Sequence, residues 1–427
     1  MNKTSSQILN FILMVLIIQP LSSLARPVEA ENDTLWLQTS KKKGYGLFID
    51  TGYSGLNIHE ISNESKWIAM IPEDIQEAQL AVDYLDWTVV TYENILENNR
   101  DFLPKFVELN YPGRIDTTNI PSWEENTVKV ILGKKGKSKV YIVDSNGNND
   151  FRDDTVRILG DINVIPTKQK LVKFHYQRYD GRKMAADSSW IRVGLDANNT
   201  PSISAAQHLV STFNIENQQY EIQVINFKPF FRFGFESPIL SVTSKNGEKK
   251  DSLLLSERLE IGEYLEIGNA YYKFEEVSKS GKTISLIKTQ DVSNLIGTQV
   301  GFLAPQFEGV TTSNDSIKLS DYKGKELLIV NITACYSPKM SYEYYQELSE
   351  KFLGKLEILA IDESPGVLQR NIDNLDLKGK FIISQGNQSL KNSYREDYCS
   401  RVCYLINREG RIIKKFEISD WEKALAN

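Results

Sequence analysis

The segment LLIVNITACYSPKM, Leu327 to Met340, decides the fold of the C-terminal part of this 427-residue chain. Its apolar run, Leu327 to Ile332, is typical of a buried strand. The polar, proline-containing residues that follow lead into a helical pattern from Met340 to about Leu353. We therefore expect a buried strand that opens onto the N-terminus of a helix.

Five further segments extend this pattern in both directions. They are GFLAPQF (301–307), IKLSDYKGK (317–325), LEILAID (356–362), SLKNSYRED (389–397) and CYLINREGRIIKKF (403–416). In this order they resemble a thioredoxin-superfamily redoxin of the TlpA-like kind, a family of extracytoplasmic thiol-disulfide oxidoreductases related more distantly to peroxiredoxins. The resemblance covers residues 295–427 and implies an α/β thioredoxin-like domain there.

The departure from that family lies at its reactive positions. On the family pattern V-N-F-W-A-x-W-C-x-x-C, Val330 and Asn331 match, but Ser337 and Met340 stand where the two cysteines are expected. Arg401 falls on the family's cis-proline. All three residues that the family uses for dithiol exchange are therefore changed.

These replacements remove the chemistry of exchange at the turn. Disulfide exchange needs a thiolate, which the partial positive charge of a helix N-terminus stabilises. A serine hydroxyl starts too far above neutral pH for the same field to ionise it, and a thioether forms no disulfide. We expect a degenerate site at Ser337 and Met340, and a binding or scaffold role for the domain.

The three cysteines of the chain, Cys335, Cys399 and Cys403, all lie near this degenerate site. If residues 399–403 are extended, the Cα atoms of Cys399 and Cys403 lie about 13 Å apart, beyond the roughly 7 Å limit of a disulfide. We therefore favour a pair of Cys335 with Cys399 or with Cys403. Such a pair is either structural or a relocated redox pair; in a third alternative the thiols stay reduced and buried.

A relocated pair would make the chain a thiol-disulfide oxidoreductase after all. A looser alignment makes Cys335 the lone nucleophile of a peroxiredoxin-like peroxidase. The proline and arginine with which such enzymes orient peroxide have no match here. Peroxidase activity is the weakest of the three functional alternatives.

The remainder of the chain divides, on sequence, into three parts. Residues 1–30 are typical of an export signal, with Lys3 before the apolar core Phe11 to Ile18, which is too short to span a membrane. An α+β region is expected over 31–135, and a β-rich domain over 136–290. The mature protein is thus expected in a periplasm or outside the cell, touching a membrane only through the signal.

One loop of the β-rich domain suggests a cation site. In VDSNGNNDFRDD, Asp144, Asn146, Asn148 and Asp150 alternate as oxygen ligands do in a calcium loop. Thr155 replaces the bidentate acid, however, and an Asx-rich turn explains the same residues. Calcium is the one cofactor considered, and a calcium-dependent rise in melting temperature that Asp144→Ala abolishes would establish it.

Two other segments carry predictions about structure. Period-two alternation over about 170–288 predicts an antiparallel sandwich or barrel, with Phe231, Phe233 and Phe235 on one face as core or, less plausibly, as a docking surface. The segment Pro72 to Leu109 fits an amphipathic helix from Pro72, although YLDWTVVTY inside it also fits a strand.

Composition excludes some partners. The net charge of −6 and the lack of a basic aromatic stripe argue against nucleic acid. His59, His175 and His208 are scattered, without the spacing of a zinc site. A protein or peptide is the expected partner, held as an extended chain by backbone hydrogen bonds.

Overall fold

The computed structural model describes residues 34–48, 53–61, 66–98, 101, 126–162, 171–179, 183–226, 233–235, 238–251, 253, 257–278, 280–289, 294–332, 338–352, 354–362, 364–394 and 401–426. The expected export signal, residues 1–30, lies outside these ranges. Among the described residues, no helix combines the length and apolar character needed to cross a membrane.

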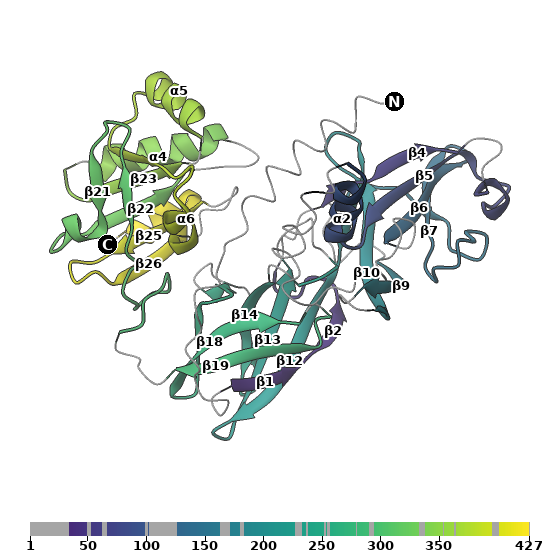
Figure 1. Cartoon of the computed structure of the whole chain (residues 1–427), viewed down its shortest axis with the longest axis horizontal. Coiled ribbons are helices and arrows are strands. Elements are labelled where there is room, and N and C mark those ends of the chain that lie inside the picture. The colour runs from purple at the N-terminus through teal and green to yellow at the C-terminus, as the bar shows by residue number, and fades with distance from the viewer. Residues whose placement is uncertain are drawn as a thin grey trace.

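The first of two sandwiches joins a five-stranded and a four-stranded antiparallel sheet (Figure 1). The five-stranded sheet has the order β4 (Asn57–Glu60), β5 (Gln76–Tyr84), β6 (Thr127–Lys135), β7 (Ser138–Val143) and β8 (Arg157–Ile158). The other has the order β3 (Ser54–Gly55), β11 (Pro201–Ala205), β10 (Met184–Leu195) and β9 (Val172–Tyr179). Alternate side chains of both sheets, such as Val130 and Phe174, form one apolar core between them.

The second sandwich is built from a different set of strands. One sheet has the order β15 (Glu248–Lys249), β14 (Pro238–Lys245), β13 (Gln218–Asn226), β12 (Gln207–Ile215) and β2 (Ser40–Lys43), with β16 (Leu259–Glu260) also paired to β14. The facing sheet has the order β1 (Thr34–Gln38), β19 (Thr283–Thr289), β18 (Ala270–Val277) and β17 (Tyr264–Ile267). Leu240 and Phe274 are fully buried members of the core between them. The expected antiparallel sandwich is therefore observed, in two copies.

The boundary expected between residues 135 and 136 needs correction. β6 and β7 form a hairpin across it, with Lys135 paired to Ser138. The N-terminal strand β1 also pairs with β19, about 250 residues away in sequence, and β2 pairs with β12. Because the early strands complete the later sheets, residues 31–135 and 136–290 are interleaved and do not form two successive units.

The segment that begins at Pro72 contains a strand and a helix, but not where they are expected: YLDWTVVTY, which also fits a strand, is helical from Trp87 onward. β5 is a strand, and α2 (Trp87–Asn98) is a helix that follows it directly. The expected single helix from Pro72 is therefore wrong, because Leu80 and Val82 pack on one face of a sheet and Ala81 on the other.

The phenylalanines of PFFRFGFE are core residues where the structure describes them. Phe233 packs in the core of the first sandwich and Phe235 in that of the second. Both are almost completely buried. They therefore join two cores and do not share one face; Phe231 lies outside the described residues.

The C-terminal region is an α/β domain. Its sheet has the order β24 (Lys380–Ile383), β23 (Glu357–Asp362), β22 (Leu327–Asn331), β25 (Val402–Ile406) and β26 (Ile412–Glu417). β22, β23 and β24 are parallel, whereas β25 and β26 are antiparallel to their neighbours. A hairpin of β20 (Glu308–Val310) and β21 (Ser316–Lys318) precedes this sheet.

Helices cover both faces of the sheet (Figure 1). They are α4 (Pro338–Phe352), α5 (Pro365–Leu375), α6 (Gln388–Tyr394) and α7 (Trp421–Leu425). Leu327 and Ile329 of β22 face the core with α6, whereas Leu328 and Val330 face the core with α4, α5 and α7. This two-sided burial explains the unbroken apolar run in the sequence. The strand order, strand directions and helix positions are those of a thioredoxin-like fold.

The segment 294–298, which leads from the second sandwich to the α/β domain, is partly buried, at Leu295 and Thr298. Thr298 is 5% exposed, and its hydroxyl donates a hydrogen bond to Glu263 Oε1 at 2.6 Å. The fully buried Lys415 Nζ of β26 lies 3.5 Å from the same Glu263 oxygen. Phe302 also makes edge-to-face contacts with Tyr264 and Tyr271. The α/β domain is therefore joined to the second sandwich by a buried contact.

Candidate functional site

The candidate site is the carboxyl edge of the parallel strands, where β22 ends and α4 begins. β22 ends at Asn331, and α4 begins at Pro338. Ile332 N donates a hydrogen bond to Ile361 O, so the chain is still fixed to β23 one residue beyond the strand. In open α/β sheets, ligands bind at this edge because the connections leave the sheet there in different directions.

The expected degenerate positions fall on either side of the start of α4. Met340 is the third residue of the helix, and its backbone is helical. Ser337, which immediately precedes the helix, and Cys335 lie outside the described residues. Met340 therefore lies in the first turn of α4, and its correspondence to the second cysteine of the resembled family stays a prediction.

Asn331 ties the end of β22 to the start of β25. Its Nδ2 donates to the Val402 carbonyl at 2.8 Å and to the Tyr394 carbonyl at 3.3 Å. Asn331 is fully buried, and its Oδ1 has no hydrogen-bond partner among the described residues. The amide therefore holds both ends of the chain between Tyr394 and Val402, which contains Cys399.

A buried phenol of α4 meets a carboxylate at the end of the neighbouring strand, β23. The Tyr342 hydroxyl of α4 donates a hydrogen bond to Asp362 Oδ2 at the end of β23. Burial, and then the hydrogen bond to Asp362, raise the pKa of Tyr342. Asp362 Oδ1 also accepts a bond from Ser364 N at 2.7 Å. The carboxylate is thus used to hold the start of α5 against α4.

Cys403 is a core residue. It pairs with Val330 in the sheet, is fully buried and belongs to the apolar core with Tyr342 and Phe416. Its thiol is free, and burial is the main cause that raises its pKa, with a further contribution from Glu417. A thiol in this state is neither ionised nor accessible. Because Cys403 is free, the expected pairing of Cys335 with Cys403 is not observed.

Arg401 and Cys399 lie in the connection to β25. Arg401, on the family's cis-proline position, is partly exposed, and its carbonyl accepts a hydrogen bond from Ile418 N at 2.9 Å. Cys399 lies outside the described residues, so a pair of Cys335 with Cys399 stays a prediction.

The structure describes the whole loop of the expected calcium site, but each of the four predicted ligands makes other hydrogen bonds or an ion pair. Asp144 accepts backbone hydrogen bonds from Gly147 and Asn149 at 2.8 and 3.1 Å. Asp150 pairs with Arg152, which lowers the pKa of Asp150 to about 2. The amides of Asn146 and Asn148 both donate to Asp153.

These contacts are those of an Asx-rich turn. Burial raises the pKa of Asp144, the best-buried carboxylate of the loop. Within the described part of the chain, no group of three His, Cys, Asp or Glu side chains is arranged to hold a metal ion. The oxygen atoms of the four predicted ligands are therefore not left free around one centre. Calcium binding stays a prediction.

Sequence reasoning missed the hydrogen bonds of Asn331 and the Tyr342–Asp362 pair. A signal for Asn331 is present, because it is the one strongly polar residue in the apolar run LLIVNI. A polar side chain at such a place is retained only with partners. Nothing in the sequence indicates that Tyr342 meets Asp362.

Several solved structures are similar to part of this chain, while no protein-family model and no curated protein matches it. The thioredoxin domain of a thiol-disulfide oxidoreductase from Bacteroides vulgatus is 20% identical, with 27% of this chain and 86% of that one covered and a TM-score of 0.24. A thiol:disulfide interchange protein from a Bacteroides species is 19% identical, covering 32% and 93%, with a TM-score of 0.25. StoA from Bacillus subtilis is 13% identical, covering 28% and 96%, with a TM-score of 0.24.

Proposed function

We propose that this is an exported protein, periplasmic or secreted, whose thioredoxin-like domain binds a protein or peptide partner and does not exchange disulfides at the β22–α4 turn. One observation carries this proposal. α4 begins at Pro338, so that Ser337 precedes the helix and Met340 lies in its first turn. These are the places where a thiolate would gain from the partial positive charge of the helix N-terminus.

The proposal rests on the chemistry of the replaced groups. The helix N-terminus is retained, but the hydroxyl of Ser337 does not ionise near neutral pH and the thioether of Met340 has no proton to lose. Cys403, the nearest described thiol, is buried on the face of the sheet covered by α4 and has a raised pKa. Two-electron exchange therefore lacks a thiolate at residues 337 and 340, the two positions that carry the cysteines in the resembled family.

A partner chain is expected beside Arg401. In the resembled fold, the loop at this position lies against the exchange turn and holds an extended substrate through backbone hydrogen bonds. The Asn331 amide fixes both ends of this connection to β22. We infer that the partner is an extended segment of another protein, bound without a covalent step.

Insulin reduction by the purified protein with dithiothreitol tests the proposal. We expect the wild-type rate to equal that of the Cys335→Ser variant and of buffer. Consumption of hydrogen peroxide by the same two proteins tests the peroxidase alternative, for which no turnover is expected. Turnover that depends on Cys335 in either assay would contradict the proposal.

A second function, a thiol-disulfide oxidoreductase that uses Cys335 and Cys399, is favoured by the Asn331 contacts. Cys335 follows Asn331 by four residues, and Cys399 lies between Tyr394 and Val402, whose carbonyls both bind the Asn331 amide. Chain reach from this anchor, about 3.3–3.6 Å per residue, allows the two sulfur atoms to meet. This pairing also leaves Cys403 reduced, as observed.

Thiol counting separates a structural from a redox pair. If Cys335 and Cys399 form a structural disulfide, mass spectrometry of the alkylated native protein should show one disulfide that mild dithiothreitol leaves intact. A redox pair would instead be reduced readily and would drive insulin reduction. The Cys399→Ser variant would then lose the same activity as Cys335→Ser.

A further inference from the structure

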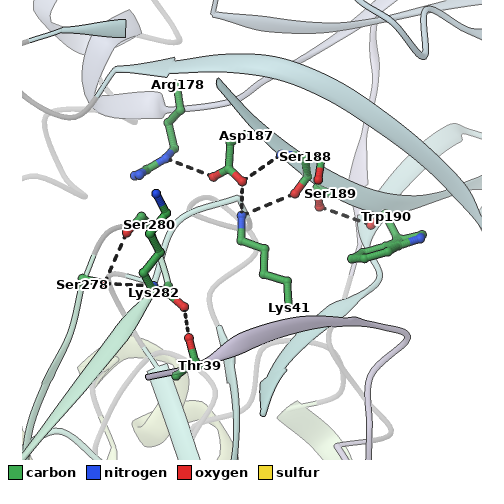
Figure 2. A network of polar contacts seen from close by, with 11 residues as sticks. Thr39, Lys41, Arg178, Asp187, Ser188, Ser189, Trp190, Ser278, Ser280 and Lys282 are labelled. Atoms are coloured by element: carbon green, nitrogen blue, oxygen red, sulfur yellow. Dashed lines mark hydrogen bonds and ion pairs between the residues drawn. The ribbon is translucent and has the colours of Figure 1, made fainter. Parts of the chain in front are cut away.

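Three basic side chains from three different sheets meet at one carboxylate in the N-terminal region (Figure 2). Lys41 belongs to β2, Arg178 to β9, and Lys282 to the turn between β18 and β19. The carboxylate is Asp187 of β10. Lys41 Nζ lies 2.6 Å from Asp187 Oδ1, and Arg178 Nε lies 3.4 Å from Asp187 Oδ2.

The charges of this cluster do not balance. Three cations face one anion, and the side chains of Lys41 and Arg178 are only 15% and 9% exposed. Burial lowers the pKa of Lys41; Asp187 raises it again, and Arg178 and Lys282 lower it further. A structural ion pair needs one cation for each carboxylate, so among the described residues this cluster carries more positive than negative charge. Lys41 and Arg178 are mostly buried, whereas Lys282 is exposed.

One donor of the cluster, on Arg178, is also unsatisfied among the described residues. Arg178 Nε is buried and has no hydrogen-bond acceptor among the described residues, since its contact with Asp187 is an ion pair without hydrogen-bond geometry. Buried donors of this kind cost free energy unless an acceptor is present. In Figure 2 the Lys282 side chain, like that of Lys41, rises from below toward the Arg178 guanidinium and Asp187.

Two hydroxyl groups lie at the edge of the cluster. Ser278 Oγ and Ser280 Oγ are 3.4 Å apart, and Ser278 Oγ accepts the backbone hydrogen bonds of Lys282 and Thr283, each at 3.0 Å. These bonds fix the turn that carries Lys282. With Ser278 so engaged, the hydroxyl of Ser280 is the one that is placed to donate to a ligand.

We propose that Arg178 and Lys282, with Ser280 at the rim, form a site for a small tetrahedral oxyanion, phosphate or sulfate. Such an anion neutralises the surplus positive charge and supplies acceptors to the Arg178 guanidinium. Donors that reach the site from separate sheets suit a tetrahedral group better than a planar carboxylate. In the absence of the anion, Asp187 holds the side chains of Lys41 and Arg178 in place.

Thermal unfolding and calorimetric titration of the full chain with sodium phosphate and with sodium sulfate, at an ionic strength held constant with sodium chloride, test the site. The wild-type protein should show a saturable rise in melting temperature with at least one of the two anions. Comparing the two anions separates a phosphate site from a sulfate site. Sodium acetate should have no such effect at the same concentration.

Lys282→Gln is the test variant, because Lys282 is exposed and the backbone bonds of its turn are retained. Lys288→Gln is the matched control, since it removes the same charge from an exposed position on the same hairpin. We expect the dissociation constant to rise about tenfold in Lys282→Gln, as for the loss of one charge-assisted hydrogen bond, and to be unchanged in Lys288→Gln. Absence of a saturable effect in the wild type, equal weakening in both variants, or acetate acting as well as phosphate would overturn the proposal.

Discussion

The side-chain amide of Asn331 donates a 2.8 Å hydrogen bond to the carbonyl of Val402, and so connects the end of β22 to the first residue of β25. The same nitrogen reaches the Tyr394 carbonyl at 3.3 Å, at the end of α6. A single buried side chain therefore fixes the connection that carries Cys399 and Arg401 beside the degenerate turn.

Replacing Asn331 by alanine should destabilise the α/β domain by about 1–3 kcal/mol, because two buried carbonyls each lose a hydrogen bond, although the Tyr394 carbonyl keeps the one from the Tyr404 hydroxyl. Urea unfolding followed by fluorescence measures the change. Asn374→Ala, at an exposed position of α5, is the control and should change the free energy of unfolding by less than about 0.5 kcal/mol. Equal effects of the two variants would show that the Asn331 bonds contribute nothing.

Cys403 should be unreactive in the folded protein. In a Cys335→Ser/Cys399→Ser background it is the one remaining thiol, and its burial and raised pKa keep it protonated. We expect no reaction with Ellman's reagent at pH 8 until urea is added. Reaction of the native protein at the rate of an exposed cysteine would contradict the placement of Cys403 in the core.

Glu263 and Lys415 should be energetically coupled. Glu263→Gln leaves the fully buried Lys415 ammonium without the carboxylate 3.5 Å away, and we expect a loss of about 3 kcal/mol. Because Lys415→Met removes the charge that needs compensation, the double variant should be less destabilised than the sum of the single variants. A double-mutant cycle from urea unfolding measures this, and strict additivity would mean that the pair is not coupled.

Tyr322 should make the protein less stable at alkaline pH. Burial, followed by the nearby Glu357 and Asp321 carboxylates, raises the pKa of Tyr322 from 10.0 to about 12. Between these values the unfolded chain loses a proton that the folded chain keeps, so the free energy of unfolding falls as pH rises from about 10 to 12.

Tyr322→Phe should reduce this alkaline loss. The Tyr322 hydroxyl is buried without a hydrogen-bond partner among the described residues, so its removal should change stability at pH 7 by less than about 0.5 kcal/mol. Urea unfolding at pH 7, 9 and 10.5 compares the two proteins. An identical pH dependence in both would show that Tyr322 titrates normally.

Local patterns predicted much of this fold. The apolar run from Leu327 is β22 in the structure. The alternation of apolar and polar residues in VKFHYQRY matches the alternating burial along β9, whose buried side chains face the core of the first sandwich. The helix after the turn begins at Pro338, two residues before the expected start at Met340. Such patterns indicate which face of a helix or strand is buried, and they can be read from residues that are close in sequence.

Long-range pairing was not predictable in the same way. β1 pairs with β19 through residues as distant as Leu35 and Leu286, and no local pattern distinguishes this partner from any other strand. The contacts of the candidate site residues were not predictable for the same reason. Asp144 is placed as a calcium ligand by spacing alone, but its carboxylate is taken by backbone groups of its own turn, and Asp150 by Arg152.

The most direct test of the central claim restores the missing thiols. In a Cys335→Ser background, which removes the nearby alternative thiol, the double substitution Ser337→Cys/Met340→Cys places two cysteines at the start of α4. We expect this variant to form a disulfide between residues 337 and 340 and to reduce insulin in the presence of dithiothreitol, whereas the wild-type protein stays at the buffer rate. Cysteine-dependent turnover by the wild-type protein, or a restored pair that neither forms a disulfide nor reduces insulin, would contradict it.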